Sequence, residues 1–390
     1  MTTPLQSEAL VLDTSRTRRY GTGKFVVFLA SLLLVSCYST AAQSTSDQAE
    51  LNDSHFHLTN YIQQGTDIHD FLAIMGTKVG RVALFGIPLQ QQWSYQNSGD
   101  FAPSYYLQTD APLYYYSFTD AYIAMAYRSL APEQRARFDP MITGFDPSDM
   151  YAVDHIRRVL ETFPGVFSGI GEFTIHKEFV SSKISGETAS LTNPALDRIL
   201  DFAAQVGLVV LIHNDVDVPF SKEGAEPVYL AQMKSLLKRH PNNKIIWAHC
   251  GVGRVVRPVN QHAAMLQSIL GDPEMNNVYF DISWDELAKY IVASSASVQI
   301  TADLINRYPD RFLFGTDEVA PSNQEKYLRV YREYEPLWNA LSTEASVSVR
   351  KDNYERLFDE ARKKVRAWEA ANPRENTSTT VSGGRASELP

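Results

Sequence analysis

The chain lacks an excess of positive charge, has few cysteines, and contains no apolar run long enough to cross a membrane as a stable helix. Its 390 residues include 36 Lys and Arg against 45 Asp and Glu, which gives a formal net charge of −9. Nucleic-acid-binding proteins are usually basic, so this balance argues against that class. With 44% hydrophobic and 21% charged residues, the composition is that of an ordinary globular protein.

The two cysteines, Cys37 and Cys250, lie in different contexts, and we do not pair them. Cys37 ends the segment GKFVVFLASLLLVSC, which follows several basic residues. A basic region followed by about a dozen apolar residues is typical of a secretory signal. The last four residues of this segment, LVSC at 34–37, resemble the lipobox of bacterial lipoproteins, in which the cysteine is lipidated and becomes the new N-terminus.

We therefore predict that residues 1–37 are a signal peptide with a lipobox, and that the protein is exported and attached to the membrane through lipidated Cys37. Its location would be the cell envelope, on the periplasmic face or at the outer membrane. A plain cleaved signal or an uncleaved anchor is the alternative. The partial twin-arginine pattern TRRY at 17–20 leaves the export route open, and Cys250 would remain a lone thiol.

Composition divides the rest of the chain into three parts. Residues 38–49 are small and polar and indicate a flexible tether, and residues 372–390 have almost no apolar content, which indicates a disordered tail. Between them no linker-like change in composition occurs, so we predict one domain over residues 50–371.

Apolar runs of strand length recur within this domain, and most are continuous rather than alternating. Strands that are buried on both faces of a parallel sheet have this pattern. The eight runs are AELNDSHFHL (49–58), VGRVALFGIP (79–88), FDPMITGFD (138–146), GVFSGIGEF (165–173), GLVVLIHND (207–215), KIIWAHCG (244–251), NVYFDISW (277–284) and RFLFGTDEV (311–319).

Helical patterns lie between several of these runs, at residues 148–164, 193–207, 226–241 and 295–309. Repeated strand–helix alternation predicts an α/β fold, specifically a (β/α)8 TIM barrel. A doubly wound open sheet is the alternative, but no glycine-rich phosphate loop follows the first strand to support it. Residues 89–137 form an unusually long connection after the second strand, with a tyrosine-rich first half that could be a lid and a helix from about Thr119.

Polar residues that can bind a metal lie near the ends of five predicted strands. In a barrel, the C-terminal ends of the strands carry the chemistry, and burying such polar groups is costly unless they are paired or bind an ion. The two histidines of NDSHFHLTN point the same way because strand side chains alternate. The predicted metal ligands are His55, His57, Glu172, His213, His249 and Asp317.

This set of residues on a barrel resembles the amidohydrolase superfamily of metal-dependent hydrolases. The sequences AHCGVGR at 248–254, GTD at 315–317 and NYERLF at 353–358 resemble its Amidohydrolase-2 branch. The resemblance implies a metal held by His55, His57 and Asp317 and a second metal held by His213 and His249, with Glu172 as a bridge. Many members use a carboxylated lysine in place of Glu172, and some have one metal, so either one or two ions are possible.

The resemblance implies a hydrolase that cleaves a C–O or C–N bond of a small organic substrate such as a lactone, an ester or an amide. A bound divalent ion, zinc first and manganese or iron as alternatives, would lower the pKa of water to about 7. Asp317 would be the catalytic proton carrier; in a one-metal site His249 would polarise the substrate or move a proton. The alternatives are a non-oxidative decarboxylase of the same superfamily and a non-catalytic lipoprotein that binds a metal or a ligand.

Two further residues are predicted to bind the substrate. Arg254 follows the sixth strand and could bind a substrate carboxylate, although a surface arginine is an equal alternative. His176 follows Glu172 on the next loop and could line the pocket together with Lys177. We predict that Cys250 faces away from His249, because neighbouring residues on a strand alternate. The sequence leaves the substrate and the oligomeric state open.

Overall fold

The computed structural model describes residues 49–373, apart from residues 104, 187, 223 and 260. Cys37, the signal segment, nearly all of the tether and residues 374–390 lie outside the described residues, so the lipid anchor and the tail stay predictions. Within the described part of the chain, no helix is long and apolar enough to cross a membrane.

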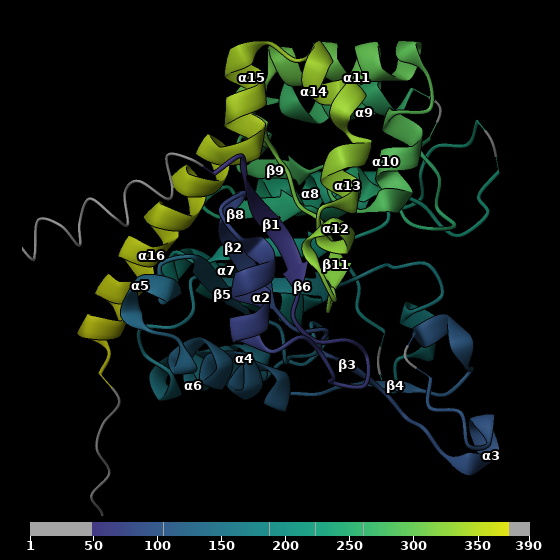
Figure 1. Ribbon diagram of the computed structural model, residues 1–390. Coiled ribbons are helices and arrows are strands. Elements are labelled where there is room, and N and C mark those ends of the chain that lie inside the picture. The colour runs from purple at the N-terminus through teal and green to yellow at the C-terminus, as the bar shows by residue number, and fades with distance from the viewer. Residues whose placement is uncertain (1–48, 104, 187, 223, 260, 374–390) are drawn as a thin grey trace, which may run out of the picture. The chain divides into compact units, whose positions relative to one another are not determined.

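A parallel sheet of nine strands forms the centre of the fold, in the order β10-β9-β8-β7-β6-β5-β2-β1-β11 (Figure 1). Each of the eight predicted runs contains a strand, which confirms their positions. The strands of the sheet are β1 (Leu51–His57), β2 (Val79–Phe85), β5 (Phe138–Ile142), β6 (Gly169–Thr174), β7 (Val209–His213), β8 (Lys244–Trp247), β9 (Val278–Asp281), β10 (Phe312–Leu313) and β11 (Glu318–Val319).

The eighth predicted strand is interrupted, and its two halves pair with opposite ends of the sheet. β10 pairs with β9, whereas β11 pairs with β1. Between them, the carbonyl of Phe314 accepts a hydrogen bond from the backbone N–H of Ser54 (3.0 Å), and Asp317 N–H donates to the carbonyl of His55 (2.8 Å). This segment therefore connects the first and last strands and closes the sheet, which confirms the predicted TIM barrel.

Side chains inside the barrel form a core that is closed at one end by the last helix, α16 (Asn353–Ala371). Inward-facing residues such as Phe85, Leu211 and Ile246 pack in one cluster with Leu357 and Phe358 of α16. This cluster fills the barrel at the end that α16 covers. The other end of the barrel, where the strands terminate, is left open for a functional site.

Helices follow the strands and pack against their outer faces, in a larger apolar cluster. The helix after β6 begins after Asn193, whose side chain caps it by accepting from Ala195 N–H, and it ends at Gly207 with φ +85°. The other helices are α2 (Ile68–Met75), α3 (Tyr95–Ser98), α4 (Phe118–Ser129), α5 (Pro132–Arg135), α6 (Ala152–Thr162), α7 (Pro194–Val206), α8 (Leu230–Arg239), α9 (His262–Leu270), α10 (Asp285–Ile291), α11 (Ser295–Arg307), α12 (Gln324–Tyr327), α13 (Arg329–Glu333), α14 (Glu335–Ala340) and α15 (Thr343–Val347).

Two predicted helices begin later than the sequence pattern suggests. The predicted helix at 148–164 begins at Ala152, because the side chain of Asp149 accepts from Tyr151 N–H and forms a turn there. The predicted helix at 226–241 begins at Leu230. Apolar periodicity identifies the face of a helix but does not identify the residue at which the helix begins.

The long connection after β2 contains a small antiparallel pair, β3 (Leu89–Gln91) and β4 (Leu113–Tyr115), with α3 between them. Figure 1 shows this pair and α3 below and to the right of the sheet. Tyr106 and Leu113 of this connection pack against Val180 and Ile184 of the loop after β6. We call residues 89–117 the insertion, and this packing anchors it beside the strand ends.

Candidate metal centre and active site

The six predicted metal ligands come together at the C-terminal ends of the strands. In the first group, Nε2 of His57 lies 3.0 Å from Oδ1 of Asp317, and Nε2 of His55 lies 3.3 Å from the same oxygen. In the second group, Nδ1 of His213 lies 2.6 Å from Oε1 of Glu172. The ligand atoms within each group of three, His55 with His57 and Asp317 and Glu172 with His213 and His249, lie within 4.8 Å of one another.

Glu172 lies between the two groups. Its Oε1 contacts the second group, while its Oε2 lies 3.5 Å from Nε2 of His57 and 3.8 Å from Nε2 of His55. The rings of His55 and His249 stack with their centroids 4.9 Å apart, so the two groups are contiguous. This is the arrangement that a bridging carboxylate requires, although bridging itself stays a prediction.

Two of the site residues have backbone conformations that side chains rarely adopt. His249 has φ +52° and Asp317 has φ +53°. His249 and Cys250 lie after the end of β8, in the 3-10 element Ala248–Gly251. Neither residue is in a strand, so strand alternation, from which we predicted that Cys250 faces away from His249, does not apply to them. Cys250 is nevertheless buried in the outer apolar cluster, with 2% of its surface exposed.

Asp281 is a site residue that the sequence analysis missed. It ends β9, and its Oδ2 lies 2.9 Å from Nδ1 of His55, while its Oδ1 accepts from His249 N–H (2.7 Å). The hydroxyl of Ser283 lies between Asp281 and Nδ1 of His249. The signal was in the sequence, since Asp281 directly follows the apolar residues VYF (278–280) inside the seventh run, but the run was drawn to continue to residue 284.

The carboxyl groups of the centre are ionised. Burial by itself would raise the pKa of Glu172, but Lys177 and His213 outweigh it and hold that pKa well below its ordinary value. Burial likewise opposes ionisation of Asp317, and the neighbouring His55 holds its pKa well below the usual range. Two buried anions beside imidazole rings form a negative centre that favours a cation.

Several imidazole nitrogens lack the partners that buried polar atoms need. Nε2 of His55 and Nε2 of His249 are buried and have no hydrogen-bond partner among the described residues. Burial lowers the pKa of His249, which favours a neutral ring with a lone pair. Burial acts in the same direction on His55 and His213, but the carboxylates beside them outweigh it and raise the pKa of both rings, so a bound cation would replace their protons. Neutral imidazoles with ionised carboxylates are the donor set of zinc, manganese and iron. The residues therefore fit a divalent transition-metal ion.

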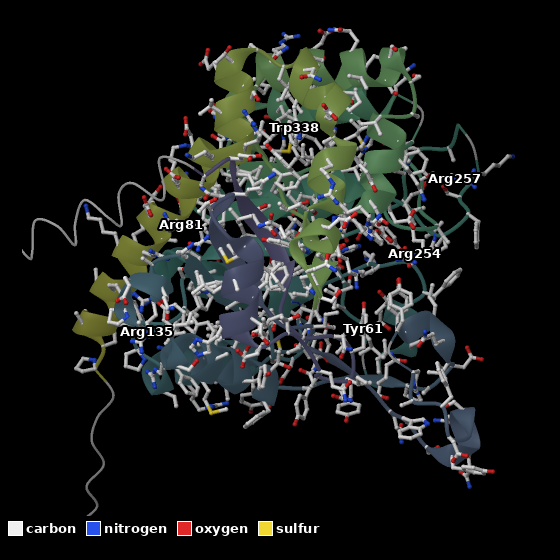
Figure 2. The ribbon with its side chains drawn as sticks, in the orientation of Figure 1. Tyr61, Arg81, Arg135, Arg254, Arg257 and Trp338 are labelled. Carbon is white, nitrogen blue, oxygen red and sulfur yellow. The ribbon has the colours of Figure 1, made fainter. Side chains whose placement is uncertain are left out.

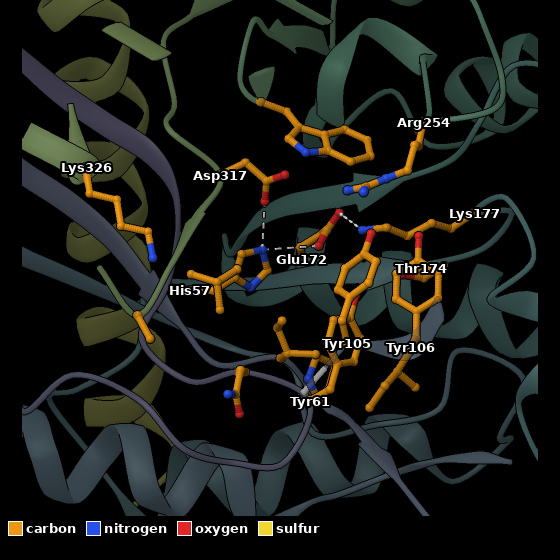
Figure 3. Close-up of a pocket in the computed structure, with 17 residues that line it drawn as sticks. His57, Tyr61, Tyr105, Tyr106, Glu172, Thr174, Lys177, Arg254, Asp317 and Lys326 are labelled. Atoms are coloured by element: carbon orange, nitrogen blue, oxygen red, sulfur yellow. Dashed lines mark hydrogen bonds and ion pairs between the residues drawn. The ribbon is translucent and has the colours of Figure 1, made fainter. Parts of the chain in front are cut away.

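A cavity of about 450 Å³ adjoins His57, Glu172 and Asp317. Figure 3 shows Arg254 and Lys177 on one side of it and Lys326 on the other. Nζ of Lys177 lies 3.4 Å from Oε1 of Glu172, inside the site.

Aromatic rings complete the walls of this cavity. Tyr105 and Tyr106 of the insertion line it together with Tyr61 and Trp284. The guanidinium of Arg254 lies over the ring of Tyr105 at 4.9 Å and over that of Trp284 at 5.4 Å. The cavity therefore combines cationic groups with flat apolar surfaces beside the metal ligands.

The two residues predicted to bind the substrate lie in different places. Arg254 lines the cavity, as its predicted role requires. His176 does not line it; its ring stacks on Tyr229 with the centroids 3.6 Å apart. The prediction for His176 needs correction, because the chain turns after β6 and directs Lys177, and not His176, into the cavity.

The closed barrel and its metal-ligand cluster define a metal-dependent hydrolase of the (β/α)8 class. A family model described as Amidohydrolase, of the Amidohydrolase-2 type, matches residues 53–359, so this chain belongs to that family. A comparison with curated protein sequences found no match.

Solved structures similar to this chain share little sequence with it. A proposed 2-pyrone-4,6-dicarboxylic acid hydrolase from Pseudomonas putida is 14% identical, with a TM-score of 0.48, and the match covers 80% of this chain and 97% of that one. A zinc-bound amidohydrolase from Burkholderia multivorans is 13% identical, with a TM-score of 0.46 and coverage of 79% and 99%. Dihydroorotase from Campylobacter jejuni is 13% identical, with a TM-score of 0.46 and coverage of 79% and 83%.

Proposed function

We propose that this enzyme hydrolyses a C–O or C–N bond of a small anionic organic substrate, a lactone, an ester or an amide, with one or two divalent ions. Zinc is the first candidate, with manganese or iron as alternatives. The observation that carries the proposal is the pair of buried, unpartnered Nε2 atoms of His55 and His249 beside the ionised carboxylates of Glu172 and Asp317.

The residues divide into two ligand sets. His55, His57 and Asp317 would hold the first ion, and His213 and His249 the second, with Glu172 between them. When bound, such an ion activates water for attack and polarises the scissile bond.

The remaining steps belong to the side chains. The ionised carboxylate of Asp317 would accept the proton of the attacking water and return it to the leaving group. Arg254 and Lys177, on one side of the cavity, would bind an anionic group of the substrate. The rings of Tyr105 and Trp284 would pack against its apolar part and exclude water from the reacting bond.

The test has two parts. Elemental analysis of the purified protein should find at least one divalent transition ion per chain, and the double variant His55→Ala, His57→Ala should lack it. A panel of lactones, amides and aryl carboxylates should then be assayed in ¹⁸O-labelled water. Incorporation of one labelled oxygen into the product supports hydrolysis, whereas release of carbon dioxide without labelling identifies the alternative, a decarboxylase. If the purified protein held no metal under any expression condition, neither the hydrolase nor the decarboxylase would be supported.

We also propose that the enzyme is exported and lipid-anchored through Cys37, on the grounds of LVSC after a short apolar segment. Cys37→Ser should prevent lipid attachment and move the protein to the soluble fraction. Unchanged membrane association of this variant would favour an uncleaved anchor.

A further inference from the structure

Glu178, outside the metal centre, joins four of the loops that follow the barrel strands. Its Oε2 accepts from the hydroxyl of Tyr106 in the insertion after β2, and its Oε1 accepts from the backbone N–H of Arg254 after β8. Its own backbone N–H, after β6, donates to Oδ2 of Asp215 (2.6 Å), which follows β7. The other oxygen of Asp215 lies 3.0 Å from Nε2 of His213, so these contacts reach the metal centre.

The surroundings of Glu178 enforce this arrangement. Its exposed fraction is 9%, and its φ of +47° lies in the left-handed region that side chains rarely adopt. A buried carboxylate is tolerated where hydrogen bonds satisfy it, and loss of one partner leaves the other group unsatisfied. A strained backbone of this kind persists only where the neighbouring structure holds it, and it is common at functional sites.

Both side chains that depend on Glu178 line the cavity. Tyr106 contributes part of one wall, and the guanidinium of Arg254 packs on the ring of the adjacent Tyr105. The insertion and the Arg254 loop are therefore joined in two ways, through hydrogen bonds to one carboxylate and through the contact of the Arg254 guanidinium with the Tyr105 ring. Lys183 also holds the insertion, because its Nζ donates to the carbonyls of Tyr106 and Thr109. The backbone N–H of Arg254 donates to Glu178 and not to Lys183.

We infer that Glu178 is a positioning residue that couples the placement of the insertion beside the metal centre to the orientation of Arg254. With its carboxylate in place, Tyr106 and Arg254 face the cavity together. Without it, only the contact of Arg254 with Tyr105 would join the two loops, and the anion-binding group would be less firmly aligned with the metal centre. The inference rests on the proposed function insofar as Arg254 binds the substrate.

Hydrogen exchange of the metal-loaded protein tests the coupling without a substrate. In Glu178→Met, which keeps the side-chain length but lacks both acceptors, amides of residues 105–109 and 252–256 should each exchange about fivefold or more faster. Lys183→Met should accelerate exchange only at 105–109. Glu178→Gln should restore near-native exchange at both, because its amide oxygen can accept from Arg254 N–H while its amide nitrogen donates to Tyr106 Oη.

Tyr106→Phe supplies a milder variant if Glu178→Met does not fold. Loss of the hydroxyl should accelerate exchange at 105–109 and, to a smaller extent, at 252–256. The coupling is refuted if Glu178→Met accelerates only one segment, if Lys183→Met accelerates both equally, or if Tyr106→Phe leaves 252–256 unchanged.

A kinetic measurement distinguishes positioning from general stability. With a substrate from the panel, KM of Glu178→Met should rise about tenfold while kcat stays within about threefold and metal content is unchanged. If KM of Glu178→Gln rose as much as that of Glu178→Met, the inference would be contradicted, since a positioning role predicts a KM near the wild-type value in Glu178→Gln. Failure of the wild-type protein to turn over any substrate would count against the proposed function alone, because the exchange experiment does not depend on it.

Discussion

Asp281 Oδ2 lies 2.9 Å from Nδ1 of His55, on the side of the ring opposite to Asp317. A carboxylate at Nδ1 fixes the proton there and leaves Nε2 as the ligating atom. The second oxygen of Asp281 accepts from His249 N–H, so one carboxylate orients a residue of each ligand group. Asp281 therefore orients candidate ligands of both groups from the side away from the other carboxylates.

Asp281→Asn should lower the affinity for the metal about 10- to 100-fold, the usual effect of removing such a supporting group. The amide keeps the volume but loses the charge that holds the His55 tautomer. Competition with a chelator of known affinity measures the change. Asp100→Asn, at an exposed position in the insertion, is the control and should bind metal as the wild type does. An unchanged affinity in Asp281→Asn would show that His55 is oriented by its packing alone.

At the barrel end closed by α16, Asp139 forms a buried ionic cluster. Its carboxylate receives hydrogen bonds from Nη2 of Arg81 (2.9 Å), Nε of Arg362 (2.5 Å) and the hydroxyl of Tyr354 (2.7 Å). Figure 2 shows Arg81 beside α16 and well separated from Arg254. Burial would raise the pKa of Asp139, but the two arginines outweigh it and lower that pKa.

Asp139→Asn should reduce the free energy of unfolding by about 3–5 kcal/mol, because Arg81, which is largely buried, loses its buried charged partner and keeps only the exposed Asp359. Urea unfolding at pH 7 measures the loss. Asp359→Asn is the matched control: Asp359 also pairs with Arg81, but 63% of its side chain is exposed, and its loss should cost less than about 1 kcal/mol. Metal affinity should be unchanged in both variants. Equal effects of the two substitutions would mean that the cluster contributes no more than a surface ion pair.

The sequence predicted the barrel and the convergence of six candidate ligands because both leave local signals. Each buried strand is an apolar run, and a histidine or carboxylate at the end of such a run is exceptional. His55, Glu172 and Asp317 come together because a closed parallel barrel places all strand ends on one rim.

The walls of the cavity could not be predicted in the same way. Whether Tyr106 or His176 faces the metal centre depends on contacts between loops that are distant in the chain, such as that of Tyr106 with Glu178. Periodicity carries no information about these contacts. The irregular backbone at His249 likewise overrides the strand pattern, since the chain leaves β8 before that residue.

His176 predicts a pH dependence of stability. Burial lowers the pKa of this imidazole to about 4, despite the nearby Asp215, so the folded state holds it neutral. The unfolded chain binds the proton more readily, with a pKa near its ordinary value of 6.5. Stability should therefore fall as pH decreases from about 6.5 to about 4, and this contribution is fully present above that window.

His176→Phe keeps a ring to stack on Tyr229 but cannot be protonated. Between pH 6.5 and 4 it should lose less stability than the wild type, by about 1–3 kcal/mol after allowance for its partial exposure. Urea unfolding with EDTA present, so that metal loss does not contribute, measures the difference at each pH. Parallel stability curves for the two proteins would show that His176 is not held neutral in the folded state.

Glu172→Gln tests the two-ion arrangement. Glu172 contacts both ligand groups, and the amide has one weak oxygen donor in place of two charged ones. The variant should lose one ion per chain more readily than the other, with the ion held by His55, His57 and Asp317 retained. Stepwise chelation followed by elemental analysis measures whether the two ions are lost one after the other or together. Loss of both ions together, or a wild-type content of a single ion, would contradict the bridge.

Asp317 has two roles in the proposed mechanism, as a metal ligand and as the proton carrier. Asp317→Asn keeps the size and one oxygen, but the amide cannot take up a proton at neutral pH. The metal should stay bound through the remaining ligands, while turnover should fall about 10²- to 10⁴-fold, the usual contribution of general acid–base catalysis. Elemental analysis is therefore made on the same samples as the rate measurements. Near-wild-type turnover at full metal content would assign the proton transfer to another residue, and His249, whose Nε2 lies 3.9 Å from Oδ2 of Asp317, would be the next candidate.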